Sequence, residues 1–271
     1  MDTLQIAKEQ VISLDHVADG IRGLRLAFVN VFAVTHLDSS WTLVDAALPF
    51  TARLIRHWAE KHFNWPPNAI VLTHGHFDHV SAAGELAREW DVPIYAHPME
   101  FPYLTGISEY PAPDVDVGGG LMSLVSPLYP RGPVNLSDWL RELPADGGGI
   151  SGLAQLPGWQ VLHTPGHSPG HVSFYRPEDR ALIVGDAFCT TKPESFFEVA
   201  LAQPPELHGP PSYFTSNWEH AGRSVQRLAE LEPRIVFPGH GRPLAGEFVA
   251  QALHRLAEEF GPLAAAAKKV A

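Results

Sequence analysis

Short apolar runs, several of them rich in β-branched residues, alternate along the chain with polar breaks and with segments of helical spacing. Residues 24–34 and 41–46 are two such runs on either side of the polar residues 36–40, and together they predict a β-hairpin. Residues 51–63 have helical spacing, with Thr51 in the N-cap position. The first part of the chain is therefore expected to combine strands with a helix.

The same alternation continues toward the C-terminus. Residues 69–72 form an apolar run that predicts a buried strand, and residues 81–90 predict a helix after it. Further strands are predicted at 92–97, 159–163, 172–175, 181–184 and 234–237, and further helices at 217–231 and 247–269. No internal repeat or second core stands out, so we expect residues 1–271 to form a single domain.

Residues 99–152 depart from this pattern. Prolines interrupt them throughout, and glycine triplets lie at 118–120 and 147–149. Long irregular segments within a domain are usually functional loops or linkers, and the aromatic and aliphatic content argues against disorder. We therefore expect a cap or loop insertion at about 99–152 that covers a cleft or forms an oligomer contact, with a functionless surface excursion as the alternative. A second irregular region is expected at 192–214.

Polar motifs follow the predicted strands. Directly after the run 69–72, the segment 73–79 has the sequence THGHFDH, which contains His74, His76, Asp78 and His79. Imidazole and carboxylate suit zinc, iron or manganese, and His-X-His on one face of an extended segment lets two side chains reach the same ion. Asp78 and His79 follow where the chain turns toward the next helix, so they can point to a second ion.

Three further motifs follow apolar runs in the same way. Residues 163–171 have the sequence HTPGHSPGH, residues 184–187 have VGDA, and residues 237–241 have FPGHG. With these four motifs in this order, the sequence resembles the metallo-β-lactamase superfamily over most of its length. The resemblance implies an α/β (α+β) fold: a four-layer αββα sandwich of two mixed β-sheets flanked by helices, with metal ions along one edge.

The resemblance also implies two divalent metal ions. Seven residues match the family's ligand positions: His74, His76 and His167 for one ion, Asp78, His79 and His240 for the other, and Asp186 as a bridge. Zinc is expected first, although iron and manganese suit the same ligands and are also used in the family. A structural site is the alternative, which the absence of thiolate ligands disfavours.

A site of this kind would use a metal-bound hydroxide, because coordination lowers the pKa of water from about 16 toward about 7. The hydroxide would attack a carbonyl or phosphoryl centre that the ions polarise. Asp78, or Asp186 through its bridge, would orient the nucleophile and carry a proton, which makes these two aspartates the candidate catalytic residues.

Other residues resemble supporting positions of the family. Asp45 matches an aspartate that helps to hold the metal loop, but a strand-ending or helix-capping role explains it equally well. His171 matches a supporting position, and His163 precedes its motif. His97 also resembles a position that the family often fills with histidine, but it is expected to be an ordinary histidine at a strand end.

Departures from related families narrow the substrate. Acyl-homoserine-lactone lactonases carry a tyrosine two residues after the alanine of their Gly-Asp-Ala motif, whereas this chain has Cys189 there. Tyr213 or Tyr103 could supply the missing hydroxyl, and Cys189 is expected to be an inert buried thiol or a pocket-lining group. We expect no counterpart of the C-terminal domain of glyoxalase II or of the extra domain of the nucleases.

These observations predict a dinuclear metal-dependent hydrolase acting on a small ester, lactone or thioester. Aromatic residues of the irregular segments and their surroundings, such as Phe196, Phe197 and Trp218, favour an apolar acyl group. One alternative is a mononuclear non-haem iron enzyme that resembles persulfide dioxygenases. The other is a metal-dependent binding or sensor domain without turnover.

Composition limits the partners and the compartment. A formal net charge of -11 argues against binding to the phosphate backbone of nucleic acids, and a single cysteine excludes an internal disulfide and fits a reducing compartment. The N-terminus lacks the pattern of a signal peptide, and no stretch approaches the roughly 20 apolar residues of a membrane helix. We expect a cytoplasmic protein that acts on a small molecule, without nucleic-acid or membrane partners, and a homodimer on base rates.

Overall fold

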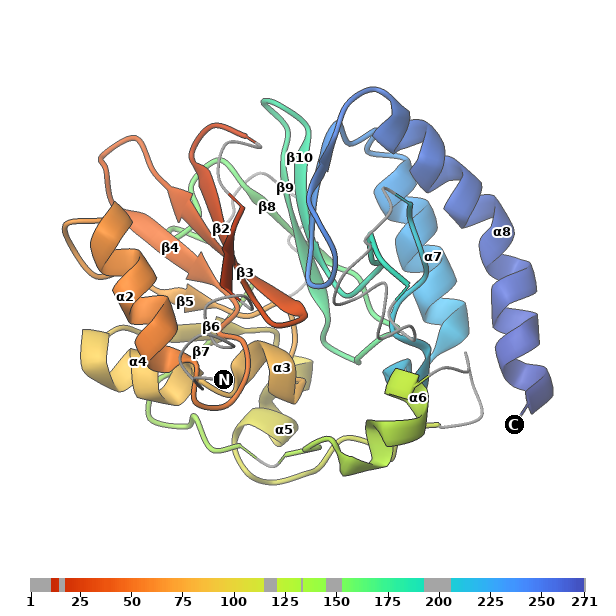
Figure 1. The fold of residues 1–271 in the computed structure, drawn as a ribbon, viewed down its shortest axis with the longest axis horizontal. Coiled ribbons are helices and arrows are strands. Elements are labelled where there is room, and N and C mark those ends of the chain that lie inside the picture. The colour runs from red at the N-terminus through yellow and green to blue at the C-terminus, as the bar shows by residue number, and fades with distance from the viewer. Residues whose placement is uncertain are drawn as a thin grey trace, which may run out of the picture.

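The computed structural model describes residues 11–14, 18–114, 121–132, 134–144, 153–192 and 206–270. Within these ranges the strands form two β-sheets (Figure 1). The first sheet has seven strands in chain order: β1 (Val11–Ser13), β2 (Ile21–Leu26), β3 (Val29–Thr35), β4 (Trp41–Val44), β5 (Ile70–Val71), β6 (Ile94–Ala96) and β7 (Leu140–Glu142). The second has five: β8 (Gln160–His163), β9 (Val172–Arg176), β10 (Ala181–Gly185), β11 (Ile235–Pro238) and β12 (Leu244–Ala245).

Both sheets are mixed. In the first, β1 to β4 are antiparallel neighbours, whereas β4 to β7 are parallel neighbours. In the second, β10 and β11 are parallel, and the remaining neighbours are antiparallel. Since β8 and β10 are both antiparallel to β9, the strands β8, β10 and β11 all run in the same direction.

The predicted strand at 24–34 was wrong in one respect. The chain turns within this run, so that it contains the end of β2, a two-residue turn and most of β3. Ala27 adopts a left-handed backbone with φ 57° in this turn, a conformation that is uncommon outside glycine. The turn was missed because Ala27 and Phe28 continue the apolar pattern. The hairpin between β3 and β4 is confirmed.

Helices cover the outer face of each sheet (Figure 1). α2 (Ala52–His62) and α4 (Ala83–Trp90) lie against the first sheet, and α7 (Trp218–Ala229) and α8 (Phe248–Val270) lie against the second. Buried apolar side chains of the described residues form three clusters: one under α2 and α4, one between the sheets, and one under α7 and α8. On β5, Ile70 belongs to the first cluster and Val71 to the second, because successive side chains of a strand point to opposite faces. These layers confirm the predicted αββα sandwich.

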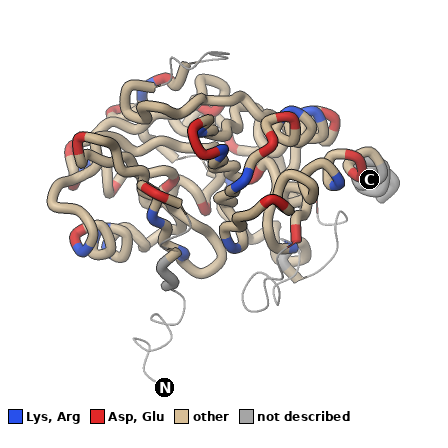
Figure 2. The backbone as a smooth tube through the Cα atoms, turned by 90° about the horizontal axis from the view of Figure 1, so that it is seen from above, with Lys and Arg blue, Asp and Glu red and all other residues tan. Residues whose placement is uncertain are grey.

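The surface of the helices is polar and mixed in charge. Figure 2 shows acidic and basic residues interspersed along the outer elements. On α2, Arg56 pairs with Glu60 and, across to α4, with Glu89 at 2.9 Å. Thr51 precedes α2 as expected, but its hydroxyl donates to the backbone oxygen of Leu48 rather than capping the helix. None of the helices in the described ranges is long and apolar enough to cross a membrane.

The predicted insertion at about 99–152 is described only in part. It contains the end of a 3-10 helix, η1 (Pro98–Glu100), followed by α5 (Phe101–Leu104), α6 (Leu121–Val125), η2 (Ser126–Leu128) and finally β7. β7 pairs with β6, so this part of the segment belongs to the first sheet. With α3 (Phe77–Val80), helices α5 and α6 lie at one end of the molecule (Figure 1). Phe196 and Phe197 lie outside the described residues.

Candidate metal centre

The predicted motifs follow strands that end at one edge of the sandwich. In the first sheet, Asp45 follows β4 and the segment 73–79 follows β5, and these two strands are parallel. In the second sheet, His167, Asp186 and His240 follow β8, β10 and β11, which run in the same direction. The carboxyl ends of parallel strands meet at the same edge, so both sheets contribute side chains to one place.

The structure brings the seven predicted ligands together. They form three overlapping groups whose nitrogen or oxygen atoms lie within 4.8 Å of one another: His74, His76 and His167; His74, His79 and Asp186; and Asp78, His79 and His240. Asp186 lies between the groups, with Oδ2 3.1 Å from His240 Nε2 and 3.5 Å from His167 Nε2. Its other oxygen, Oδ1, is 3.5 Å from His79 Nε2. All seven side chains are buried, with exposed fractions between 0 and 8%.

Contacts behind the histidines orient their rings. In four of them Nδ1 faces an oxygen atom of another residue: His74 and Thr73 Oγ1 (3.0 Å), His79 and Asp45 Oδ2 (2.8 Å), His167 and Thr215 Oγ1 (3.4 Å), and His240 and the backbone oxygen of Phe28 (2.8 Å). Such contacts fix the tautomer and orientation of histidines that bind metals. Because Nδ1 is engaged in each ring, Nε2 is the nitrogen left for an ion. Nδ1 of the fifth histidine, His76, lies 2.8 Å from His167 Nε2.

Asp45 lies where the sequence placed it, behind the segment 73–79. Its carboxylate accepts hydrogen bonds from the backbone amide and the hydroxyl of Thr73, each over 2.8 Å, and faces His79 Nδ1. The backbone of Asp45 has φ 62°, which is uncommon for a residue with a side chain and persists only when surrounding contacts fix it. These bonds support a role in holding the loop, beyond ending a strand.

The site fits a pair of divalent ions. His74 Nε2, His79 Nε2 and Asp186 Oδ1 are buried without a hydrogen-bond partner. Leaving such atoms unpaired costs about 1–3 kcal/mol each, and more for charged groups. Nitrogen and oxygen donors without a thiolate suit zinc, iron and manganese. The unpaired atoms belong to the predicted ligands and converge on common points, which is the arrangement that bound ions would satisfy.

The histidines divide into two classes by charge. Burial lowers the pKa of His74 and His167 well below the ordinary value and that of His76 to about 4. Burial acts in the same direction on His79, but neighbouring carboxylates, Asp186 first, outweigh it and raise the pKa of His79 well above the ordinary value. The same balance raises the pKa of His240 to about 10. The first class is therefore neutral, and the second is paired with carboxylates.

Three other candidates from the sequence have supporting or packing roles. His171 is fully buried, and its Nε2 accepts a hydrogen bond from the backbone amide of Asp186 over 2.9 Å. His97 belongs to none of the three groups; its ring stacks on that of His163, with centroids 4.2 Å apart. Cys189 has an exposed fraction of 0%, which favours the buried thiol over the pocket-lining group.

Aromatic side chains pack against His76 and Phe77 in the segment 73–79. The rings of Tyr110 and Phe214 lie 4.4 and 5.1 Å from that of His76. The ring of Tyr129 lies 5.4 Å from that of Phe77, which directly precedes Asp78. Burial, followed by the charge of Asp78, raises the pKa of Tyr129, which indicates that the phenol lies near this carboxylate.

The two tyrosines named from the sequence lie farther back. Tyr103 stacks on Tyr110, with ring centroids 3.9 Å apart, and Tyr213 packs on Phe214 at 5.1 Å. Tyr129, which the sequence did not single out, contacts both Tyr213 and Phe214 through its ring. Tyr110, beside His76, and Tyr129, near Asp78, are therefore the tyrosines that connect the aromatic side chains to the candidate ligands.

Asn30 is a supporting residue that was not predicted from the sequence. Its Nδ2 donates to the backbone oxygens of Pro238 (2.9 Å) and Gly241 (2.7 Å), and its backbone amide donates to the backbone oxygen of Gly239 (2.8 Å). These bonds tie β3 of the first sheet to the loop that contains His240. The available signal was an asparagine between two valines in the mostly apolar strand VNVFAVT, where asparagine is unfavourable.

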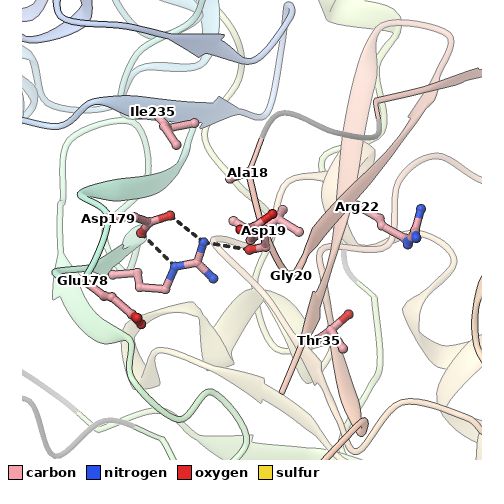
Figure 3. A pocket seen from close by; sticks show the side chains of 10 residues that line it. Ala18, Asp19, Gly20, Arg22, Thr35, Glu178, Asp179 and Ile235 are labelled. Atoms are coloured by element: carbon pink, nitrogen blue, oxygen red, sulfur yellow. Dashed lines mark hydrogen bonds and ion pairs between the residues drawn. The ribbon is translucent and has the colours of Figure 1, made fainter. Parts of the chain in front are cut away.

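A pocket of about 800 Å³ lies at the other end of the sheets (Figure 3). It is lined by the start of β11 at Ile235 and by the turn between β9 and β10. Arg176 lines it too, but donates to both oxygens of Asp179 and to the backbone oxygen of Asp19, so its charge is paired. None of the seven candidate ligands lines this pocket.

Comparison with known proteins agrees with this site. The model of the metallo-β-lactamase superfamily matches residues 24–240. The chain therefore belongs to the metallo-β-lactamase superfamily.

Particular relatives narrow the class further. The probable metallo-hydrolase YflN of Bacillus subtilis (strain 168) is 40% identical over 251 residues, 91% of this chain and 93% of YflN. The hydroxyacylglutathione hydrolase of Ectopseudomonas mendocina (strain ymp) is 26% identical over 138 residues, 51% of this chain and 39% of that enzyme. The crystal structure of TTHA1623 in a di-iron-bound form matches with a TM-score of 0.55 and 27% identity, over 83% of this chain and 93% of TTHA1623. The chain is a metallo-hydrolase of this superfamily, with a histidine and aspartate cluster suited to a dinuclear site.

Proposed function

We propose that this chain is a dinuclear hydrolase that acts on a small ester, lactone or thioester. The observation that supports this most is the buried cluster of seven nitrogen and oxygen ligands, in which Nε2 of His74 and Oδ1 of Asp186 have no hydrogen-bond partner. The second group of ligands is as complete as the first, which favours two ions over the mononuclear iron enzyme.

The proposed ligands follow from the three groups. His74, His76 and His167 would hold one ion; Asp78, His79 and His240 would hold the other; and Asp186 would bind both. Zinc is our first proposal because imidazole and carboxylate ligands suit it. Iron is the main competitor, because TTHA1623 has been crystallised in a di-iron-bound form.

The chain's own residues would orient water and move protons. When bound, a pair of divalent ions lowers the pKa of a coordinated water and polarises a substrate carbonyl. Burial opposes ionisation of Asp186, but His240 and His79 outweigh it and hold the pKa of Asp186 well below the ordinary value. The pKa of Asp78 is lowered in the same way. We propose that Asp78 Oδ2, 3.3 Å from His240 Nε2, accepts the proton of the attacking water and passes it to the leaving group.

The aromatic cluster supports an apolar acyl group in the substrate. Tyr110 and Phe214 lie against His76, and Tyr129 lies near Asp78. Acyl-homoserine-lactone lactonases have a tyrosine at the position that is Cys189 in this chain. We propose that Tyr129, rather than Tyr213 or Tyr103, supplies the corresponding hydroxyl here. The similarity to a hydroxyacylglutathione hydrolase supports a thioester within this class. A preference for short polar esters over esters with an apolar acyl group would contradict an apolar acyl pocket.

Elemental analysis of the purified protein is the first test. About two zinc, manganese or mixed ions per chain, with turnover in a panel of esters, lactones and thioesters, would support the proposal. One iron per chain with oxygen uptake would instead indicate the persulfide-dioxygenase type. Bound ions with no turnover across the panel would indicate a binding or sensor domain.

Asp186→Asn tests the bridging role. The amide cannot balance the charge of two cations. We therefore expect reduced occupancy of one ion and a kcat lowered by about two orders of magnitude or more, while the fold stays intact. The readouts are kcat, metal content and circular dichroism. Asp179→Asn, which removes a carboxylate at the far end of the sheets, is the matched control and should leave all three unchanged. Unchanged turnover in Asp186→Asn would refute the dinuclear mechanism.

A further inference from the structure

Glu100 is a buried carboxylate that belongs to none of the candidate ligand groups. It ends η1, just after β6, and its exposed fraction is 0%. A buried charge is stable only when polar partners replace the water that it loses. The partners of Glu100 therefore indicate what it does.

Four donors surround the carboxylate. Oε2 accepts hydrogen bonds from the amide of Gly75 (2.9 Å) and from the hydroxyl of Tyr110. Oε1 accepts from the hydroxyl of Ser168 (2.8 Å) and from the amide of Gly170 (2.6 Å). Each oxygen thus receives one backbone amide and one hydroxyl.

The two amides belong to the two loops that contain the first group of histidines. Gly75 lies between His74 and His76 in the loop after β5 of the first sheet, and Gly170 lies in the loop of His167, after β8 of the second. We propose that Glu100 is a positioning residue that sets the spacing of these loops, so that the three histidines present their nitrogens to one ion. The proposal rests on the proposed function, because it takes these histidines as metal ligands.

The loops are shaped for this approach. A Cβ atom at Gly170 would lie 2.8 Å from Glu100 Cγ and 2.9 Å from its backbone nitrogen, and one at Gly75 would lie 3.1 Å from Glu100 Oε2. Any side chain at Gly170 would displace the carboxylate. His76 Nδ1 and His167 Nε2, which these loops carry, lie 2.8 Å apart.

The chemistry of the donors predicts which substitution fails. Backbone amides can only donate, whereas the hydroxyls of Tyr110 and Ser168 can also accept. Glu100→Gln keeps the shape of the side chain but has one acceptor oxygen and one NH₂ group. The backbone amide of either Gly75 or Gly170 must then face this NH₂ group, which is itself a donor. Tyr110→Phe removes a hydroxyl but leaves both amides bonded, which makes it the matched control.

The experiment is a calorimetric titration of the metal-free, full-length protein with Zn²⁺. Wild type should show two binding events, and His240→Ala should identify the event of the second group by removing it. We expect Glu100→Gln to weaken the other event by about 10- to 100-fold and to leave the second within about twofold. Tyr110→Phe should have the smaller effect. Circular dichroism checks the fold.

The outcomes separate this proposal from the proposed function. Wild-type protein that binds no Zn²⁺ refutes the metal site itself. Two events in wild type that are both unchanged, or both equally weakened, in Glu100→Gln refute the positioning role. If Glu100→Gln does not fold, Gly170→Ala decides: a weakened first event supports the proposal, and unchanged affinities overturn it.

Discussion

The groups around each candidate histidine determine the direction in which its pKa is shifted. His79 and His240 have Nδ1 against an oxygen and Nε2 against carboxylates, and their pKa values are raised. The ring of His74 lies 4.2 and 4.9 Å from those of His79 and His167, and burial lowers the pKa values of His74 and His167. The two groups of ligands therefore compete differently with protons for an ion.

Proton release on metal binding tests this difference. At pH 8 metal-free His240, with its pKa of about 10, is protonated, and the raised pKa of His79 favours its protonated form, while His74 and His167 are neutral. Binding of Zn²⁺ to the second group should release protons, and the affinity of this group for Zn²⁺ should rise with pH until about pH 10, because fewer protons compete with the ion. The first group should show neither effect. Zn²⁺ calorimetry in two buffers of different ionisation enthalpy measures this. No proton release in the event that His240→Ala removes would contradict it.

Sequence motifs identified the candidate ligands and the supporting residues Asp45 and His171, but not Glu100 or Asn30. The candidate ligands stand in short motifs directly after apolar strands, so the local pattern was enough to find them. Glu100 and Asn30 have no such motif, because their partners are backbone groups 70 residues away at Gly170 and 208 residues away at Pro238. Contacts of that kind appear only once the two sheets are placed together.

Among the elements, the turn between β2 and β3 has residues that are unusual for a turn, because it packs against the candidate site. Turns usually contain glycine, asparagine or proline, but this one contains Ala27 and Phe28. The Phe28 ring stacks near that of His240, with centroids 5.9 Å apart, and its backbone oxygen faces His240 Nδ1. The turn is apolar because it packs against the site, which is why the pattern hid it.

The strand β3 and the loop of His240 form one unit that Asn30→Ala should loosen. Removing Nδ2 leaves the backbone oxygens of Pro238 and Gly241 without this donor, at a cost of about 1–3 kcal/mol. We expect the second group to bind Zn²⁺ about tenfold more weakly or worse, with the first group unaffected. Asn68→Ala, which removes an exposed bond to Ser40, is the control. Equal Zn²⁺ affinities in Asn30→Ala and wild type would contradict the prediction.

For the whole molecule, the layered fold explains both what was predictable and what was not. β4 and β10 are buried along their whole length because helices cover one face and the other sheet covers the second. They therefore appear as nearly continuous apolar runs, with Thr42 the exception in β4. β7 was missed because only Leu140 of its three residues is buried. The candidate site itself combines side chains of the segment 73–79, which follows a strand of one sheet, with His167, Asp186 and His240, which follow strands of the other.

Bound ions should therefore stabilise the association of the two sheets. A ligand at about 100 times its Kd adds about 2.7 kcal/mol to the folded state, so chelation should lower the Tm in scanning calorimetry. Phe237→Ala removes a ring that packs on Phe32 between the sheets at 5.3 Å, and should cost about 3–5 kcal/mol with or without metal. The decrease in Tm on chelation should persist in Phe237→Ala and shrink in Asp186→Asn. Equal Tm values for wild type with and without chelator would show that ions do not join the sheets.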